Sequence, residues 1–96
     1  MNNTQHTPGP WYPHYAKADH CLSSSVWGKE PGNQVAVIGG KSLETMNANA
    51  ALIAAAPAMY EALTIALQIM IDKRVPYQHE IDQARAALAQ AEGRTL

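Results

Sequence analysis

The sequence has little of what most catalytic and binding classes require. Its 96 residues include no phenylalanine and a single cysteine, Cys21, which excludes an intramolecular disulfide and favours a reducing compartment. Seven Lys and Arg residues against eight Asp and Glu residues give a net charge of -1, and no basic cluster is present. Because duplex binding needs clustered cations to displace counterions, a general DNA- or RNA-binding role is not expected.

Long hydrophobic runs are missing as well. The residues that follow Met1 have neither the charged region nor the apolar region of a signal peptide. The most apolar stretch is interrupted by polar side chains at Glu61, Thr64 and Gln68, too often for a membrane span. We therefore expect a small cytoplasmic protein that does not bind a membrane.

The composition of the chain changes near residue 44. Most of the prolines and glycines precede this point, whereas the residues after it are rich in alanine. Residues 1–7 are polar and are predicted to form a disordered tail. We expect residues 8–96 to form a single α+β domain, with a β region at 8–43 and a helical hairpin at 44–96.

The β region predicts a small three-stranded antiparallel sheet. The predicted strands are bounded by turn-forming residues and span Trp11–Ala18, Cys21–Trp27 and Gln34–Ile38. Pro13 restricts the first strand to an edge of the sheet, since proline cannot donate to a ladder. The last strand has apolar residues on both of its faces. Such a strand is either covered on both faces, or covered on one face and used in an interface on the other.

The second half predicts a kinked helix followed by an antiparallel C-terminal helix, with helical segments over about 47–56, 57–71 and 78–92. Thr45 or Asn47 can cap the first-turn amides of the first segment. Pro57 suits the first position of a helix, where its missing N–H costs nothing, so we expect a kink there. The segment after Pro57 is apolar almost all round. We therefore expect it to be buried on several sides and the protein to be a homo-oligomer.

No residues are spaced for catalysis or for metal binding. Gly39-Gly40-Lys41-Ser42 resembles the end of a P-loop, but Val35 stands where that motif requires glycine, so an ordinary strand-to-helix turn is favoured. Zinc-type spacing of cysteine or histidine is absent, and no nucleophile stands beside a base. We predict that the protein is not an enzyme and uses no cofactor and no metal.

Four residues are candidates for binding a negatively charged ligand. Lys41 and Ser42 lie near a predicted helix start, where backbone amides and the helix dipole favour anions. Arg74 and Arg85 are the stronger candidates, because a planar guanidinium binds phosphate in a bidentate manner. The alternative is that Arg74 caps a helix and Arg85 pairs with Glu92 or Asp82 on a solvated face.

Four aromatic residues are candidates for stacking on a nucleotide base. They are Trp11, Tyr12, Tyr15 and Trp27. For the two tryptophans the favoured alternative is burial, since a chain without phenylalanine needs large rings in its core. At least one of the two tyrosines is expected to be exposed.

Two segments resemble a widespread family of small phage and prophage proteins. The first is the TPGPW turn at residues 7–11, and the second is NANAALIAAAPAMYEAL at residues 47–63. The second segment departs from the family pattern at Ala51, where a basic residue is usual, and at Met59 and Tyr60, where the family has a leucine pair. The sheet-plus-hairpin plan is similar to that of Thoeris anti-defence sponges, phage proteins that sequester cyclic nucleotide immune signals as oligomers. No ligand-binding residue of those proteins can be matched here.

This resemblance implies a phage counter-defence protein in the host cytosol that sequesters a cyclic nucleotide immune signal by stoichiometric binding. The alternative is a small protein-binding inhibitor of a host defence complex, as anti-CRISPR proteins are. An enzyme that degrades the signal is disfavoured, because no acid–base pair, nucleophile or metal set is visible. The expected partner is thus a small nucleotide or a host defence protein.

Overall fold

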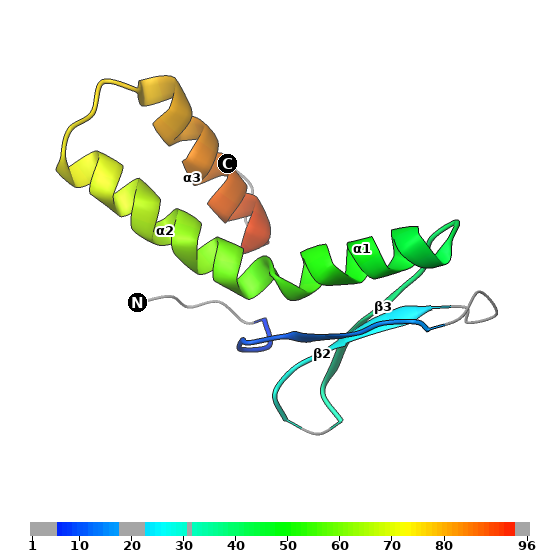
Figure 1. Cartoon of the computed structure of the whole chain (residues 1–96). Coiled ribbons are helices and arrows are strands. Elements are labelled where there is room, and N and C mark those ends of the chain that lie inside the picture. The colour runs from blue at the N-terminus through cyan, green and yellow to red at the C-terminus, as the bar shows by residue number, and fades with distance from the viewer. Residues whose placement is uncertain (1–5, 18–22, 31, 94–96) are drawn as a thin grey trace. The chain divides into compact units, whose positions relative to one another are not determined.

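The computed structural model describes residues 6–17, 23–30 and 32–93, which form two compact units. We call residues 6–58 the sheet unit and residues 59–93 the helix-pair unit. Three strands are followed by three helices, which confirms the predicted α+β class (Figure 1). The single domain over 8–96 stays a prediction. Most of the predicted tail, and the predicted strand ends at Ala18 and Cys21, lie outside the described residues.

The sheet is antiparallel, with strand order β1-β2-β3. Its strands are β1 (Tyr12–His14), β2 (Ser24–Trp27) and β3 (Gln34–Ile38). Pro13 lies on the edge strand β1, as predicted, and is paired with Val26 of the central strand.

A bulge in β3 brings two neighbouring side chains toward the core. The register shifts between Val26 and Trp27 of β2, which pair with Ala36 and Gln34 respectively. Val35 is left as the additional residue, and both Val35 and Ala36 pack against the core cluster. The bulge therefore explains why strict alternation does not describe this strand.

Helix α1 (Leu43–Ala54) covers one face of the sheet (Figure 1). The core between them is built on Val26, Ile38 and Ala50, all of them buried. Because Ala50 has a small side chain, the helix backbone can lie close to the sheet. Partly buried side chains complete this core, among them Trp11, Ile53 and Ala54.

Strand β1 is shorter than predicted because Ala16 is paired with a helix side chain instead of a strand. Its N–H donates to Oδ1 of Asn47 at 2.9 Å, and Nδ2 of Asn47 donates to its carbonyl at 2.9 Å. The hydroxyl of buried Ser24 donates to the same Oδ1 at 2.6 Å. The Asn47 amide thus takes the place of a neighbouring peptide group.

The predicted cap of α1 was wrong. Ser42 is the N-cap, since its Oγ accepts from the Thr45 N–H at 3.1 Å and its backbone is extended. Asn47 cannot serve as the cap because its amide is engaged with Ala16. The helix therefore begins at Leu43, earlier than expected.

The two segments that carry the family resemblance contact each other within the sheet unit. A Cβ placed on Gly9 would lie 2.7 Å from Cβ of Pro57, so the turn packs directly on the proline ring. Trp11 follows this turn, donates its Nε1–H to the Thr7 carbonyl at 3.0 Å and packs against the core cluster. The TPGPW turn and the proline of the helical segment therefore form one contact.

The helical half is interrupted at Ala55, two residues before Pro57, where the kink was predicted. The N–H of Ala55 still donates to the Ala51 carbonyl at 3.1 Å, and α2 (Ala56–Asp72) begins at the next residue. Pro57 is thus the second residue of α2, still in the first turn, where its missing N–H is tolerated. The boundary between the two units also falls in this turn.

The helix-pair unit consists of α2 and α3 (Gln78–Ala91), which pack through Leu67, Ile81 and Leu88. Tyr60 lies near the start of α2, and its hydroxyl donates a hydrogen bond to Oε2 of Glu92, the residue after the end of α3. The two helices are therefore antiparallel, as predicted (Figure 1).

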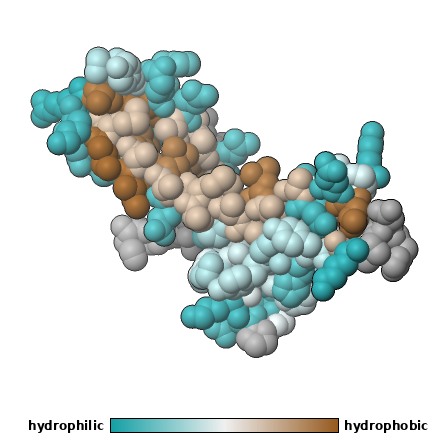
Figure 2. All heavy atoms as spheres, viewed as in Figure 1, coloured by the Kyte–Doolittle hydropathy of each residue, from teal (hydrophilic) through white to brown (hydrophobic). Residues whose placement is uncertain are grey.

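One face of α2 stays exposed in the single chain, in contrast to the predicted burial on several sides. Met59, Ile65 and Ile69 are 46%, 55% and 54% exposed. Together with the smaller Ala62 and Ala66 they form what we call the outer row of α2. Figure 2 shows hydrophobic side chains along this helix on the visible face.

Candidate functional site

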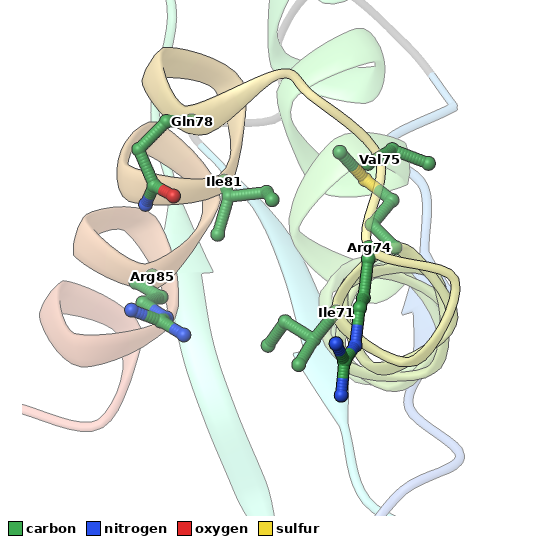
Figure 3. A pocket seen from close by; sticks show the side chains of 7 residues that line it. Ile71, Arg74, Val75, Gln78, Ile81 and Arg85 are labelled. Atoms are coloured by element: carbon green, nitrogen blue, oxygen red, sulfur yellow. The ribbon is translucent and has the colours of Figure 1, made fainter.

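Arg74 and Arg85 line one open pocket within the helix-pair unit (Figure 3). Its volume is about 260 Å³, and it lies between the C-terminal end of α2 and the N-terminal part of α3. The apolar part of the lining comes from Met70, Ile71, Val75 and Ile81. The polar part consists of the two arginines and Gln78.

Helix α3 contributes its side of the pocket through one regular face. Gln78, Ile81 and Arg85 are three and four residues apart, so their side chains line one side of the helix. Figure 3 shows Arg85 reaching from α3 toward Ile71 on α2. Gln78 was not predicted as a site residue, although its spacing of seven from Arg85 is a signal that the sequence contains.

Arg74 is held by the backbone turn that ends α2. Its N–H donates to the Ile71 carbonyl at 3.1 Å, and the N–H of Val75 donates to the Met70 carbonyl at 3.2 Å. This pair of hydrogen bonds is a Schellman motif, with Arg74 at the position where the backbone is left-handed, at φ 54. The side chain then lies alongside Ile71 (Figure 3).

Neither guanidinium forms a hydrogen bond or an ion pair with another of the residues that the structure describes. The acids near Arg85 have other partners: Asp82 accepts from Gln78 at 2.8 Å, and Glu92 accepts from Tyr60. The structure therefore does not show the alternative in which Arg85 pairs with Glu92 or Asp82. Arg74 does lie in the C-terminal cap of α2, as the same alternative expected. Two positive charges remain available at the pocket.

The chemistry of this pocket suits a small anion that has an apolar part. Two guanidiniums can donate several hydrogen bonds to phosphate or carboxylate oxygens, and the Gln78 amide adds a donor and an acceptor. The aliphatic side chains offer a surface for a flat ring. At about 260 Å³ the open pocket lies just below the usual range for small-molecule sites, about 300–1,000 Å³, so it can hold part of a larger ligand whose remainder stays outside.

Lys41 and Ser42 belong to the sheet unit, whereas the arginine pocket belongs to the helix-pair unit. Ser42 uses its hydroxyl to cap α1, and it also donates to Oγ1 of Thr45 at 3.0 Å. A Cβ on Gly40 would lie 2.9 Å from both the backbone nitrogen and Cγ of Met46, so glycine is needed for the close approach. These contacts are those of a strand-to-helix turn, the interpretation that the sequence favoured.

The two tryptophans have structural partners. Trp11 is half-buried on the core cluster, as its favoured alternative predicted. Trp27 is also half-buried; its Nε1–H donates to Oγ of Ser25 at 2.9 Å, and its ring lies 5.7 Å from that of His14. Neither indole N–H is therefore available to a ligand without loss of an existing bond.

Both tyrosines are accessible, since Tyr12 and Tyr15 are each 47% exposed. Tyr12 is paired with Trp27 in the sheet, on the face opposite α1. The structure therefore brings together Tyr12 and Trp27 in the sheet unit, and Arg74 and Arg85 in the helix-pair unit. The other predicted residues belong to the sheet unit.

Among the residues that the structure describes, no group of three or more His, Cys, Asp or Glu side chains is arranged to hold a metal ion. No single helix there has the length and apolar character needed to cross a membrane, and α1 with α2 meets that test of length and composition only as a bent pair.

Comparison with known proteins places the chain in a family. No curated protein and no solved structure matches it. The family model described as Salmonella phage P22 protein Y8K6 matches residues 1–95, so the chain belongs to this family of phage proteins.

Proposed function

We propose that this phage protein is a non-enzymatic counter-defence protein that captures a cyclic nucleotide immune signal of the host in the Arg74–Arg85 pocket. The observation that carries the proposal is the pair of arginines that have no acidic partner among the described residues and border an apolar pocket. The phosphate groups of the ligand bind to the guanidiniums, and its base lies on the aliphatic lining.

The absence of a partner matters because two neighbouring cations repel each other. In the protein alone, water screens this repulsion only in part. A phosphodiester placed between the two guanidiniums replaces repulsion with attraction on both sides. Ligand binding therefore gains from both arginines at once, and removal of either one leaves a weaker site.

Stoichiometric capture also fits a protein that presents several copies of its pocket. We propose a homo-oligomer that associates through the outer row of α2, which exposes Met59, Ile65 and Ile69. Ala62 and Ala66 are small and allow a second helix to approach closely. Burial of this row is favourable by about 25 cal/mol per Å² of apolar surface.

The second candidate function is the inhibition of a host defence protein by direct binding. It is favoured by the open face of the sheet, where Val37 is 63% exposed and Tyr12 lies beside Trp27. Exposed rings beside an aliphatic side chain are typical of protein-binding surfaces. On this alternative the arginine pocket has no ligand.

Titration calorimetry distinguishes the two functions. The wild-type protein is titrated with cyclic di-AMP, cyclic di-GMP, cyclic GMP–AMP and the cyclic ADP-ribose isomers. We expect saturable heat with at least one of them, and at least tenfold weaker binding, about 1.4 kcal/mol, for Arg85→Ala and Arg74→Ala at nearly unchanged melting temperature. Mass spectrometry after denaturation should recover the ligand unchanged, because no chemical step is proposed.

Lys73→Ala is the matched control, since it removes one exposed cation from the same helix end without touching the pocket. It should keep the wild-type affinity within about twofold, or about 0.4 kcal/mol. Equal losses for Lys73→Ala and Arg85→Ala would indicate a non-specific charge effect. If no nucleotide gives heat while the protein co-purifies with a host defence protein, the inhibitor replaces the proposal.

A further inference from the structure

Arg74 occupies a backbone position that normally belongs to glycine. In the Schellman motif at the end of α2 it has φ 54, and the motif is otherwise regular, with its hydrogen bonds formed and Val75 packed on the hydrophobic cluster. Among the described residues, Arg74 is the one non-glycine residue with positive φ. The others, Gly32 and Gly93, are glycines.

The end of α3 provides a comparison within the same unit. Gly93 follows that helix with φ 78 and donates its N–H to the Gln90 carbonyl at 3.0 Å. Glycine has no Cβ and adopts this conformation without steric cost, whereas an arginine Cβ clashes with the following carbonyl. The chain thus ends one helix of the pair with the preferred residue and the other with a strained one.

We propose, on the basis of the proposed function, that Arg74 is retained at this position because its guanidinium binds the ligand phosphate at the cost of fold stability. The left-handed backbone places the Arg74 side chain alongside Ile71, at a pocket that Arg85 enters from α3 (Figure 3). Strained residues persist where the site needs their side chain. The ligand class is a phosphate diester or pyrophosphate that two guanidiniums bind together.

Two substitutions separate the backbone of Arg74 from its side chain. Arg74→Gly removes both the strain and the guanidinium, whereas Arg74→Ala removes the guanidinium but keeps a Cβ in the left-handed conformation. Melting temperatures are measured for the wild type and both variants, with and without inorganic pyrophosphate as the probe. Calorimetry with the nucleotides named above is run in parallel.

Without pyrophosphate, we expect Arg74→Gly to melt roughly 4–8 °C above the wild type, a shift of the size that one strained residue causes in a domain of this length. Arg74→Ala should melt near the wild type. Pyrophosphate should raise the melting temperature of the wild type, and this rise should be lost in both variants. Lys73→Gly, next to Arg74 in the same turn, should lower the melting temperature and keep the pyrophosphate effect.

Each remaining outcome overturns the inference. A lower melting temperature for Arg74→Gly would show that the arginine side chain stabilises the fold, and an unchanged pyrophosphate effect in that variant would show that it does not bind the anion. No pyrophosphate effect in the wild type would likewise refute it. The proposed function fails separately if pyrophosphate binds through Arg74 and no nucleotide gives heat. It survives alone if Arg74→Gly loses nucleotide binding, as the proposed function requires, but melts below the wild type.

Discussion

The sheet unit adds polar pairs and close backbone contacts to its apolar core, whereas the helix-pair unit depends mainly on aliphatic packing. In residues 6–58 the decisive contacts are those of Asn47 with Ala16 and of Gly40 with Met46. In residues 59–93 the hydrophobic cluster is built on buried leucine and isoleucine side chains. The contacts of the first unit are directional and depend on particular atoms. The packing of the second unit requires only apolar side chains of suitable size.

This difference suggests which of the two units can carry a ligand-binding site. Directional contacts leave few side chains of the sheet unit free to bind a ligand. Its predicted site residues Ser42, Trp11 and Trp27 each form a hydrogen bond within the unit. Aliphatic packing uses one side of each helix. The remaining sides of α2 and α3 can present an apolar row and two arginines, so the helix-pair unit is where binding is expected.

The largest expected effect concerns the aliphatic core of the helix-pair unit. Leu67→Glu places a charge at a buried position and should remove more than about 3 kcal/mol of stability, or leave the chain unfolded. Ile65→Glu lies two residues away at an exposed position of the outer row. It should change the stability of the single chain by about 0.5 kcal/mol or less, measured at protein concentrations low enough for the wild type to be monomeric. Urea unfolding measures both.

The same pair tests self-association, because only Ile65 belongs to the outer row. Light scattering should show an oligomer for the wild type and a folded monomer for Ile65→Glu. A wild-type protein that remains monomeric at micromolar concentration would contradict the proposed oligomer. An oligomer that tolerates Ile65→Glu would place the interface elsewhere.

A smaller effect is expected for the amide that holds β1. Asn47→Ala leaves the buried Ala16 without its two hydrogen bonds to the amide, which should cost about 2 kcal/mol. Asn49→Ala is the matched control on the same helix, since Asn49 is exposed and makes one long contact to Gly39 at 3.4 Å. Similar losses in urea melts for both variants would mean that the network contributes nothing specific.

The smallest effect is expected at the strand-to-helix turn. Gly40→Ala brings a Cβ within 2.9 Å of the Met46 backbone, and relief of that contact should cost about 1 kcal/mol. Gly39→Ala has open space around the added Cβ and serves as the control. Thermal melts of the two variants should therefore differ, and equal melting temperatures would show that the helix start adjusts freely.

The sequence predicts the element order well because local signals mark each element. Turn formers bound the strands, and Pro57 lies within two residues of the interruption at Ala55. Gly93, the predicted stop of the last helix, lies two residues after Ala91, where α3 ends. The role of Asn47 could not be predicted in this way. Its partner Ala16 is 31 residues distant, and asparagine near a helix start usually indicates a cap.

The candidate site was predictable in its residues but not in its geometry. Arg74 and Arg85 were named from guanidinium chemistry alone, and nothing local shows that they line one pocket. Their proximity depends on a Schellman turn at Arg74, which sequence reasoning assigns to glycine. Residue propensities therefore cannot predict that an arginine occupies this left-handed position.

The pairing of Ala16 with Asn47 also bears on aggregation. Exposed sheet edges recruit strands from other molecules through their unpaired N–H and C=O groups. Just beyond β1, these groups of Ala16 are already bonded to a side chain, and Pro13 within β1 has no N–H to offer. The other edge, β3, contains neither proline nor charge. In concentrated solution, unwanted strand addition is therefore expected at β3, and a lysine in place of exposed Val37 is the natural protection.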